Sequence, residues 1–258
     1  MIQEDFLVKI KKELCKYSNI PKVLCDYIEN VIKKDAKEHL IPEIKNKKKR
    51  KIVLDTLDNL FKKASNITKL SPADIIKALD FHSKDTDLAR IDATFAELRT
   101  INFLSNLNLY NITPLQAKKG EKCADIIATG GSDKYVIEVF CKISQSSPQT
   151  EDELIKDLEN NTILNHPYTY EDDLFQYYID KSVLKKIQLD NTAKKYKCNK
   201  RIMVLVLNDQ NIFGFLTPDE CTKILSKIST ELDWGSNYYF AIVTGLVSLD
   251  IIYPPITL

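Results

Sequence analysis

Apolar side chains recur three or four positions apart through about the first 85 residues, which is the spacing of one face of a helix. At Ser71-Pro72-Ala73-Asp74 a capping hydroxyl precedes a first-turn proline, and this order favours the start of a short helix. The pattern predicts a helical region over residues 1–88. Its apolar positions are Phe6, Leu7, Ile10 and Leu14, then Val23, Leu24, Tyr27, Ile28 and Val31, and then Ile52, Val53, Leu57, Leu60 and Phe61.

From Asp92 the pattern changes to helices that alternate with strands. The continuous apolar run at residues 202–207 is typical of a central strand covered on both faces. The expected elements are a helix at 93–106, strands at 110–117, 122–129 and 134–143, a loop or short helical insertion at 145–173, a helix at 174–197, a strand at 202–207, a helix from 217 to 225, and strands at 239–247 and 249–253.

The order helix, three-strand meander, helix, strand is that of an α/β layer fold with a mixed sheet. We therefore expect two regions, a helical one at 1–88 and an α/β domain at 89–258. In the helix at 174–197 the inner side is expected to carry Tyr178, Val183, Leu184 and Ile187.

Composition narrows the class of protein. The 258 residues are 44% hydrophobic and 28% charged, with a formal net charge of +1, which excludes a histone-like basic binder and an acidic disordered chain. No apolar run approaches the roughly 18 residues of a membrane span, and no apolar signal core follows Met1. The six cysteines contain no C-x-x-C pair, which argues against a zinc site. We expect a reduced, cytoplasmic protein with no membrane partner.

Charge is distributed unevenly between the two regions. Residues 1–90 hold 20 Lys and Arg against 14 Asp and Glu, whereas residues 91–258 hold 17 against 22. The basic run at 45–51 is of a kind that binds a phosphate backbone, because neutralised phosphates release condensed counterions. Its alternative interpretation is a solvated linker between helices. The candidate nucleic-acid-binding residues in the run are Lys47, Lys48, Lys49 and Arg50.

Two acidic residues stand inside the apolar strands of the meander. If the turn at Gly130-Gly131-Ser132-Asp133 has two or four loop residues, Asp125 lies directly opposite Glu138, on the same face and with Cβ atoms about 5 Å apart. Such a pair suits a hard divalent cation, because two unscreened carboxylates in apolar surroundings repel each other. A three-residue loop would move Glu138 to the other face.

Two further residues complete the candidate site. Lys142 follows Glu138 at an even spacing and so shares its face, where it would serve a water molecule or a phosphate oxygen. Glu97 is the third carboxylate if its helix packs across the meander. The alternatives are a surface strand-end residue for Lys142 and an ion pair with Arg99 or Lys142 for Glu97. Together these residue types describe metal-assisted phosphodiester hydrolysis.

This arrangement resembles the PD-(D/E)xK superfamily, the restriction endonuclease-like fold, over roughly residues 90–210. The resemblance implies a nuclease-fold domain in which Asp125 and Glu138 bind Mg²⁺, or alternatively Mn²⁺, with the main-chain carbonyl of Val139, and Glu97 supplies the acid of the first core helix. It also implies a Lys or Gln from the helix after the third strand, for which Lys185 and Gln188 are candidates; both also suit a solvent-facing position.

The sequence departs from the family pattern at two positions. Ala124 replaces the usual proline, and Phe140 replaces the lysine that orients water. Either Lys142, Lys118 or Lys185 has taken over this role, or the site is inactive.

Three functions therefore stay open. The first is a metal-dependent DNA endonuclease of restriction, defence or repair type, with DNA as partner and a homodimer as one possible assembly. The second is a catalytically inactive nuclease-fold module that binds nucleic acid or protein. The third is a structural protein in which the acids form salt bridges with Lys142 and Lys118.

Overall fold

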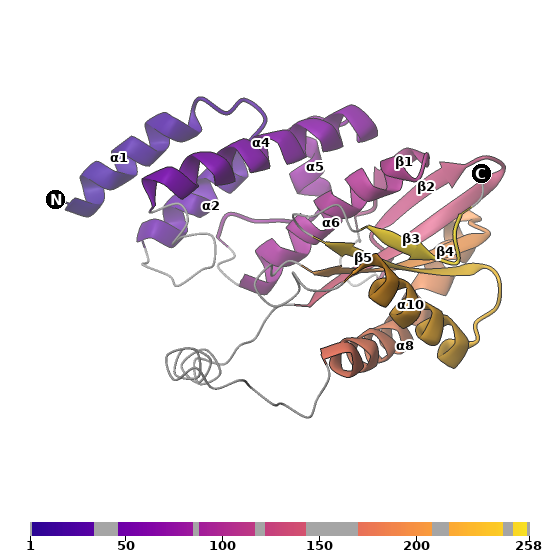
Figure 1. The fold of residues 1–258 in the computed structure, drawn as a ribbon. Coiled ribbons are helices and arrows are strands. Elements are labelled where there is room, and N and C mark those ends of the chain that lie inside the picture. Colours follow the sequence, from indigo (N-terminus) through magenta and orange to yellow (C-terminus); the bar gives the residue numbers. More distant parts are fainter. Residues whose placement is uncertain are drawn as a thin grey trace, which may run out of the picture.

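The computed structural model describes residues 2–33, 46–84, 88–116, 122–142, 170–207, 217–244 and 250–256. These residues form a mixed α/β structure around a six-stranded sheet (Figure 1). No helix in the described ranges has the length and apolar character that a membrane crossing requires.

The strands follow one another across the sheet in chain order, β1 to β6. β1, β2 and β3 form an antiparallel meander, β3, β4 and β5 are parallel, and β6 returns antiparallel to β5. The strands are β1 (Tyr110–Pro114), β2 (Ile126–Gly130), β3 (Asp133–Lys142), β4 (Lys200–Leu207), β5 (Tyr238–Thr244) and β6 (Ile251–Tyr253).

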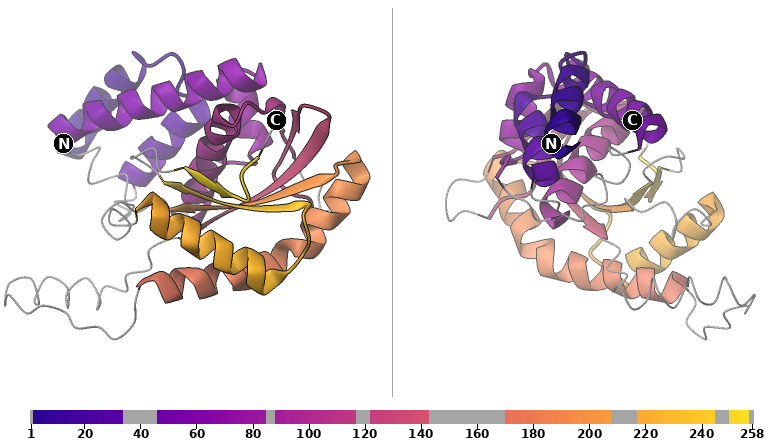
Figure 2. Two further views of the ribbon diagram at one scale, coloured as in Figure 1. Left: turned by 45° about the vertical axis from the view of Figure 1, so that its right-hand side comes forward. Right: turned by 90° about the vertical axis from the view of Figure 1, so that its left-hand side faces the viewer.

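The two faces of the sheet carry different helices (Figure 2). Parallel neighbours require crossover connections, and the helices α8 (Tyr170–Tyr196) and α10 (Pro218–Leu232) supply them on one face. The opposite face packs against α6 (Leu88–Asn106). Beyond α6 lie α1 (Ile2–Leu14), α2 (Lys22–Lys33), α4 (Lys47–Thr68) and α5 (Pro72–Ala78).

The helices before residue 84 share one hydrophobic cluster with α6 and the sheet face that it covers. A second cluster fills the space between the other sheet face and the helices α8 and α10. The helix α6 is therefore enclosed between α4 and the sheet, which explains why apolar residues such as Leu98, Ile101 and Phe103 are all buried.

The elements appear in the expected order, with different ends. β1 stops at Pro114, β2 begins only at Ile126, and α8 begins at Tyr170, inside the stretch expected as an insertion. The basic run is not a linker: Asn46 caps α4, accepting from the N–H groups of Lys48 and Lys49, so the lysines form its first turn.

The expected inner side of α8 is wrong for three of its four residues. Tyr178 is fully buried, but Val183, Leu184 and Ile187 are 54%, 73% and 73% exposed. The buried positions of the helix are instead Leu174, Tyr178, Ser182, Leu189, Thr192 and Ala193. This set holds three hydroxyl residues, Tyr178, Ser182 and Thr192, so apolar periodicity alone selected the wrong face.

The hairpin between β2 and β3 has the register that the sequence analysis requires. Gly130 pairs with Asp133 across a two-residue turn, and the ladder continues to Ile126 opposite Ile137. Gly131 has φ +56, a conformation that glycine adopts without a Cβ penalty. The ladder ends at the pair of Ile126 and Ile137: the Asp125 N–H donates to the Ile137 carbonyl at 3.1 Å, so Asp125 lies beside the end of the ladder and is not paired with Glu138.

Candidate functional site

The site forms where β2 separates from β3. Beyond the last pair of the ladder, Ile126 and Ile137, the Asp125 N–H still donates to the Ile137 carbonyl at 3.1 Å, and the next backbone N–H groups are bound by side chains. The Val139 N–H donates to Asp125 Oδ2 at 2.7 Å, and the Ala124 N–H donates to Thr192 Oγ1 at 2.9 Å. The end of the ladder is thus held by the Asp125 carboxylate and by α8.

Glu138 is fully buried and is held by two residues of α8. Lys185 Nζ lies 2.7 Å from Glu138 Oε1, and Gln188 Nε2 lies 3.2 and 3.0 Å from the two carboxylate oxygens. The Gln188 amide also donates to the Cys123 carbonyl at 2.6 Å. Gln188 therefore fixes Glu138 relative to the chain that enters β2.

Glu97 reaches the same region from α6, on the other side of the sheet. Burial first, and then the charge of Asp125, hold the pKa of Glu97 well above its usual range. Burial raises the pKa of Asp125 to about 6, against the opposing hydrogen bond from Val139. Burial and the neighbouring Asp125 raise the pKa of Glu138 to about 8.

Two cations act on these three acids. Burial lowers the pKa of Lys185, but Glu138 and the other two carboxylates outweigh it, so the pKa of Lys185 is raised and its ammonium stays charged. Arg90, on α6, lowers the pKa of Glu97 and Asp125 by its charge, although its guanidinium is also paired with Asp80 at 3.1 Å. Among the described side chains, the three carboxyl groups have one lysine at ion-pair distance, Lys185, together with the charge of Arg90, so acids outnumber cations there.

We call Glu97, Asp125, Glu138, Lys185 and Gln188 the carboxylate cluster. In the described part of the chain, no group of three or more His, Cys, Asp or Glu side chains is already arranged to hold a metal ion. A cation would therefore bind one or two of these carboxylates and complete its shell with water, as Mg²⁺ commonly does.

Phe140 lies on the α8 face of the sheet, in the second hydrophobic cluster. Its ring is 8% exposed and meets the Tyr178 ring edge-on at a centroid distance of 5.2 Å. A lysine at this position would have to bury its ammonium among aromatic rings.

The other predicted lysines are placed differently. Lys142 ends β3 opposite Leu207, and its side chain lies outside the described residues. Lys118 lies in an undescribed stretch. Lys185 is the lysine that the structure brings to Glu138.

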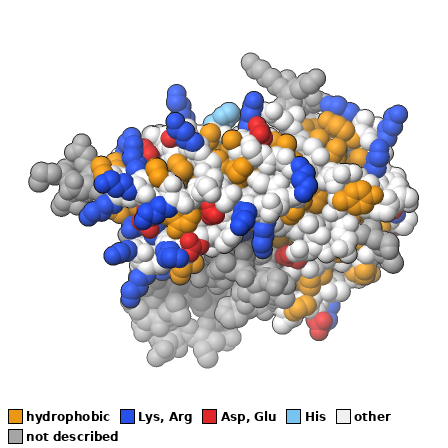
Figure 3. Space-filling model, turned by 90° about the horizontal axis from the view of Figure 1, so that it is seen from above, with side chains coloured by type: hydrophobic (Ala, Val, Ile, Leu, Met, Phe, Trp, Pro, Cys, Tyr) orange, Lys and Arg blue, Asp and Glu red, His pale blue; other side chains and the backbone are white. Residues whose placement is uncertain are grey.

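The basic run divides at the start of α4. Lys47, Lys48 and Lys49 are exposed, whereas Arg50 is buried and pairs with Glu13 of α1 at 2.7 Å. Figure 3 shows the surface formed by the helices that precede α6. Lysine and arginine side chains gather at the end of this surface where α1 and the start of α4 lie. The exposed lysines are free to meet a polyanion, but Arg50 joins α1 to α4.

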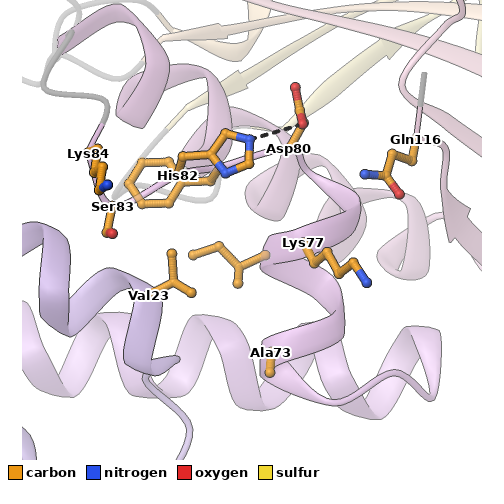
Figure 4. A pocket seen from close by; sticks show the side chains of 10 residues that line it. Val23, Ala73, Lys77, Asp80, His82, Ser83, Lys84 and Gln116 are labelled. Carbon is orange, nitrogen blue, oxygen red and sulfur yellow. Dashed lines mark ion pairs between the residues drawn. The ribbon is translucent and has the colours of Figure 1, made fainter. Parts of the chain in front are cut away.

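A hollow of about 570 Å³ lies between α2, α5 and the segment after α5 (Figure 4). Val23, Ile76 and Phe81 give it an apolar lining, and Lys77, His82 and Lys84 add polar groups. The three carboxylates do not line it. Asp80, which lines the hollow, pairs with Arg90 at 3.1 Å.

Two contributors to the site were not anticipated from sequence. Thr192 holds the entry to β2, and a threonine on an otherwise apolar helix face was the signal for it. Arg90 had no such signal, because its charge reaches Glu97 and Asp125 only after α6 packs on the sheet.

No protein-family model matches the chain, and the comparisons with curated proteins and with solved structures give no match either.

Proposed function

We propose that this protein is a metal-dependent DNA endonuclease that hydrolyses phosphodiester bonds, with Asp125 and Glu138 as metal ligands and Glu97 as an assisting acid. The observation that carries the proposal is the deficit of positive charge in the carboxylate cluster. Three acids from α6, β2 and β3 converge where burial raises the pKa of each. Perturbed acids of this kind concentrate at functional sites.

The residues present fit a hard divalent cation, Mg²⁺ or Mn²⁺, because the donors are carboxylate oxygens. When bound, such a cation would polarise the phosphate and lower the pKa of its water. The main-chain carbonyl of Val139 is a further ligand by resemblance to the nuclease superfamily.

The side chains of the cluster have separate tasks in this proposal. The Val139 N–H and Gln188 hold the two ligand carboxylates in place. Lys185 fills the role of the water-orienting lysine, which Phe140 cannot fill. The Lys185 ammonium is charged and lies beside Glu138. There it would orient the attacking water or bind a phosphate oxygen.

The topology supports the same proposal. A helix, an antiparallel meander, a crossover helix and a parallel strand follow one another as α6, β1, β2, β3, α8 and β4. This order was predicted from apolar periodicity, and the resemblance to the restriction endonuclease-like core rests on it. The exposed lysines of α4 would add affinity for the phosphate backbone through counterion release.

The test is cleavage of supercoiled plasmid with Mg²⁺ or Mn²⁺, compared with EDTA. Wild-type protein is expected to nick or linearise DNA, and Asp125→Ala to lose this activity and its Mn²⁺ binding in calorimetry. Asp219→Ala is the matched control, because Asp219 is an exposed acid at the start of α10. Equal cleavage by wild type and Asp125→Ala would exclude this site.

A catalytically inactive, nucleic-acid-binding module is the second candidate. It is favoured by the saturation of Glu138, whose two oxygens are already held by Lys185 and Gln188. This candidate predicts salt-sensitive DNA binding that persists in Asp125→Ala, together with no cleavage under any divalent cation. Saturable Mn²⁺ binding that Glu138→Ala abolishes would count against it.

A further inference from the structure

The outer face of α8 carries an unusual concentration of exposed apolar surface. Six large hydrophobic residues are classed as exposed in the described part of the chain, and three of them are Val183, Leu184 and Ile187. They stand within five positions on one helix. Burying such side chains stabilises a contact, so a face of this kind is typical of a binding surface.

The polar residues of the same face are ordered by charge. Exposed positions recur three or four residues apart along the helix, which places them in one stripe. Asp180 stands before the apolar residues and Lys194 after them. We call this the α8 stripe; it consists of Gln176, Asp180, Val183, Leu184, Ile187, Asn191 and Lys194.

We propose that the α8 stripe binds the α8 stripe of a second copy of this chain, with the two helices antiparallel. In that orientation Ile187 lies near the two-fold axis, and Asp180 of each copy faces Lys194 of the other. A parallel arrangement would instead place like charges together. The stripe is thus complementary to itself in one orientation only, as a two-fold contact requires.

The position of the stripe agrees with this assignment. α8 lies on the outside of the molecule, with the sheet on its inner side (Figure 2). From residue 176 to residue 194 the stripe is roughly 27 Å long, at 1.5 Å per residue. A contact of one helix per copy is smaller than the roughly 1,600 Å² of a standard interface, so we expect a reversible dimer.

Lys185 and Gln188 contact Glu138 on the inner side of α8, so a dimer through the outer stripe would leave the two carboxylate clusters outside the contact. The inference does not depend on the proposed function. Self-association of α8 is expected whether or not the carboxylates hold a metal.

The test is sedimentation velocity on the full chain, from about 1 to about 100 µM. The wild type is expected to shift from monomer to dimer with concentration, and Ile187→Glu to remain monomeric. Ile52→Glu is the matched control, because Ile52 is 68% exposed on α4, away from the stripe. A wild type that stays monomeric throughout, or an equal effect of the two variants, would overturn the inference.

Charge reversal tests the antiparallel orientation. Asp180→Lys alone and Lys194→Asp alone are each expected to weaken the dimer about threefold to tenfold, and the double variant to recover wild-type association. A double variant no better than either single variant would overturn the antiparallel arrangement. If monomeric Ile187→Glu loses thermal stability, the chain itself covers the stripe. That result would overturn the proposal that the stripe binds a second copy.

Discussion

Two charged clusters lie next to each other along α8, and they have opposite electrostatic balance. In the carboxylate cluster three acids share Lys185 as their only close cation among the described side chains. In the second cluster Asp190 alone accepts from Lys186 at 2.8 Å, from Arg201 at 2.7 Å, and from the Tyr238 hydroxyl.

The pKa values reflect this difference. Burial acts to raise the pKa of Asp190, but its hydrogen bonds with Lys186, Tyr238 and Arg201 outweigh it, and the pKa is lowered. In the carboxylate cluster burial prevails and every acid has a raised pKa. The paired Asp190 is typical of a residue that stabilises a fold. Buried acids with too few cations around them destabilise a fold, and such acids are common at functional sites.

The largest expected effect separates activity from stability. Glu138→Gln should reduce metal-dependent DNA cleavage about 1,000-fold, because it removes a ligand charge, while leaving the melting temperature equal or higher. Asp190→Asn should retain cleavage and lose about 2 kcal/mol of unfolding free energy, because two cations lose their partner. Plasmid cleavage and urea unfolding measure the two effects. If Glu138→Gln and Asp190→Asn both lose stability and neither loses cleavage activity, the contrast between the two clusters is wrong.

A lysine at position 140 should destabilise the protein and should not raise its activity. Phe140→Lys is expected to cost about 3 kcal/mol or more of stability, because an ammonium group would replace a ring packed on Tyr178. Cleavage per folded molecule should not increase. Phe140→Leu, which keeps the site apolar, serves as the control. A stable and more active Phe140→Lys variant would contradict the assignment of Lys185.

A smaller effect is expected at Lys185. Lys185→Met should lower cleavage about 10-fold to 100-fold while Mn²⁺ affinity stays equal or rises, because the ammonium competes for Glu138. Lys186→Met, one position along the same helix, should leave cleavage unchanged and weaken the Asp190 cluster. Calorimetric Mn²⁺ titrations and single-turnover cleavage rates distinguish the two. Reduced Mn²⁺ affinity in Lys185→Met would contradict this role.

The pH dependence of stability is expected to be the mildest effect. Ordinary carboxyl pKa values are about 4, whereas the pKa of Asp125 is about 6 and that of Glu138 about 8. Between pH 4 and 8 the folded cluster therefore keeps protons that the unfolded chain has released, so its contribution to stability falls as pH rises. Asp190 acts oppositely, because its lowered pKa favours folding above pH 4 and this gain is lost in acid.

Calorimetry from pH 5 to 8 tests this expectation. Wild-type metal-free protein should lose stability across this range more steeply than Glu138→Gln. Added Mg²⁺ should stabilise the wild type more at pH 8 than at pH 5, because protons compete with the cation for the carboxylates. Identical slopes for wild type and Glu138→Gln would show that Glu138 does not carry the shift.

The sequence by itself determined the features that depend on neighbours in the chain. The order of helices and strands follows from apolar periodicity, and the hairpin register from Gly130–Asp133 to Ile126–Ile137 follows from the length of one turn. Because a hairpin register is fixed locally, the sequence could place Asp125 at the end of this ladder, near Glu138, without any knowledge of the rest of the fold.

Only the tertiary structure decided which side of α8 faces the sheet. The helix carries apolar residues on two sides, Tyr178 and Leu189 on one and Leu184 and Ile187 on the other, so its periodicity does not choose between them. The choice is made by contacts with distant strands, where Lys185, Gln188 and Thr192 meet Glu138 and the entry to β2. Long-range packing thus placed the cation beside the acids and left an apolar stripe exposed.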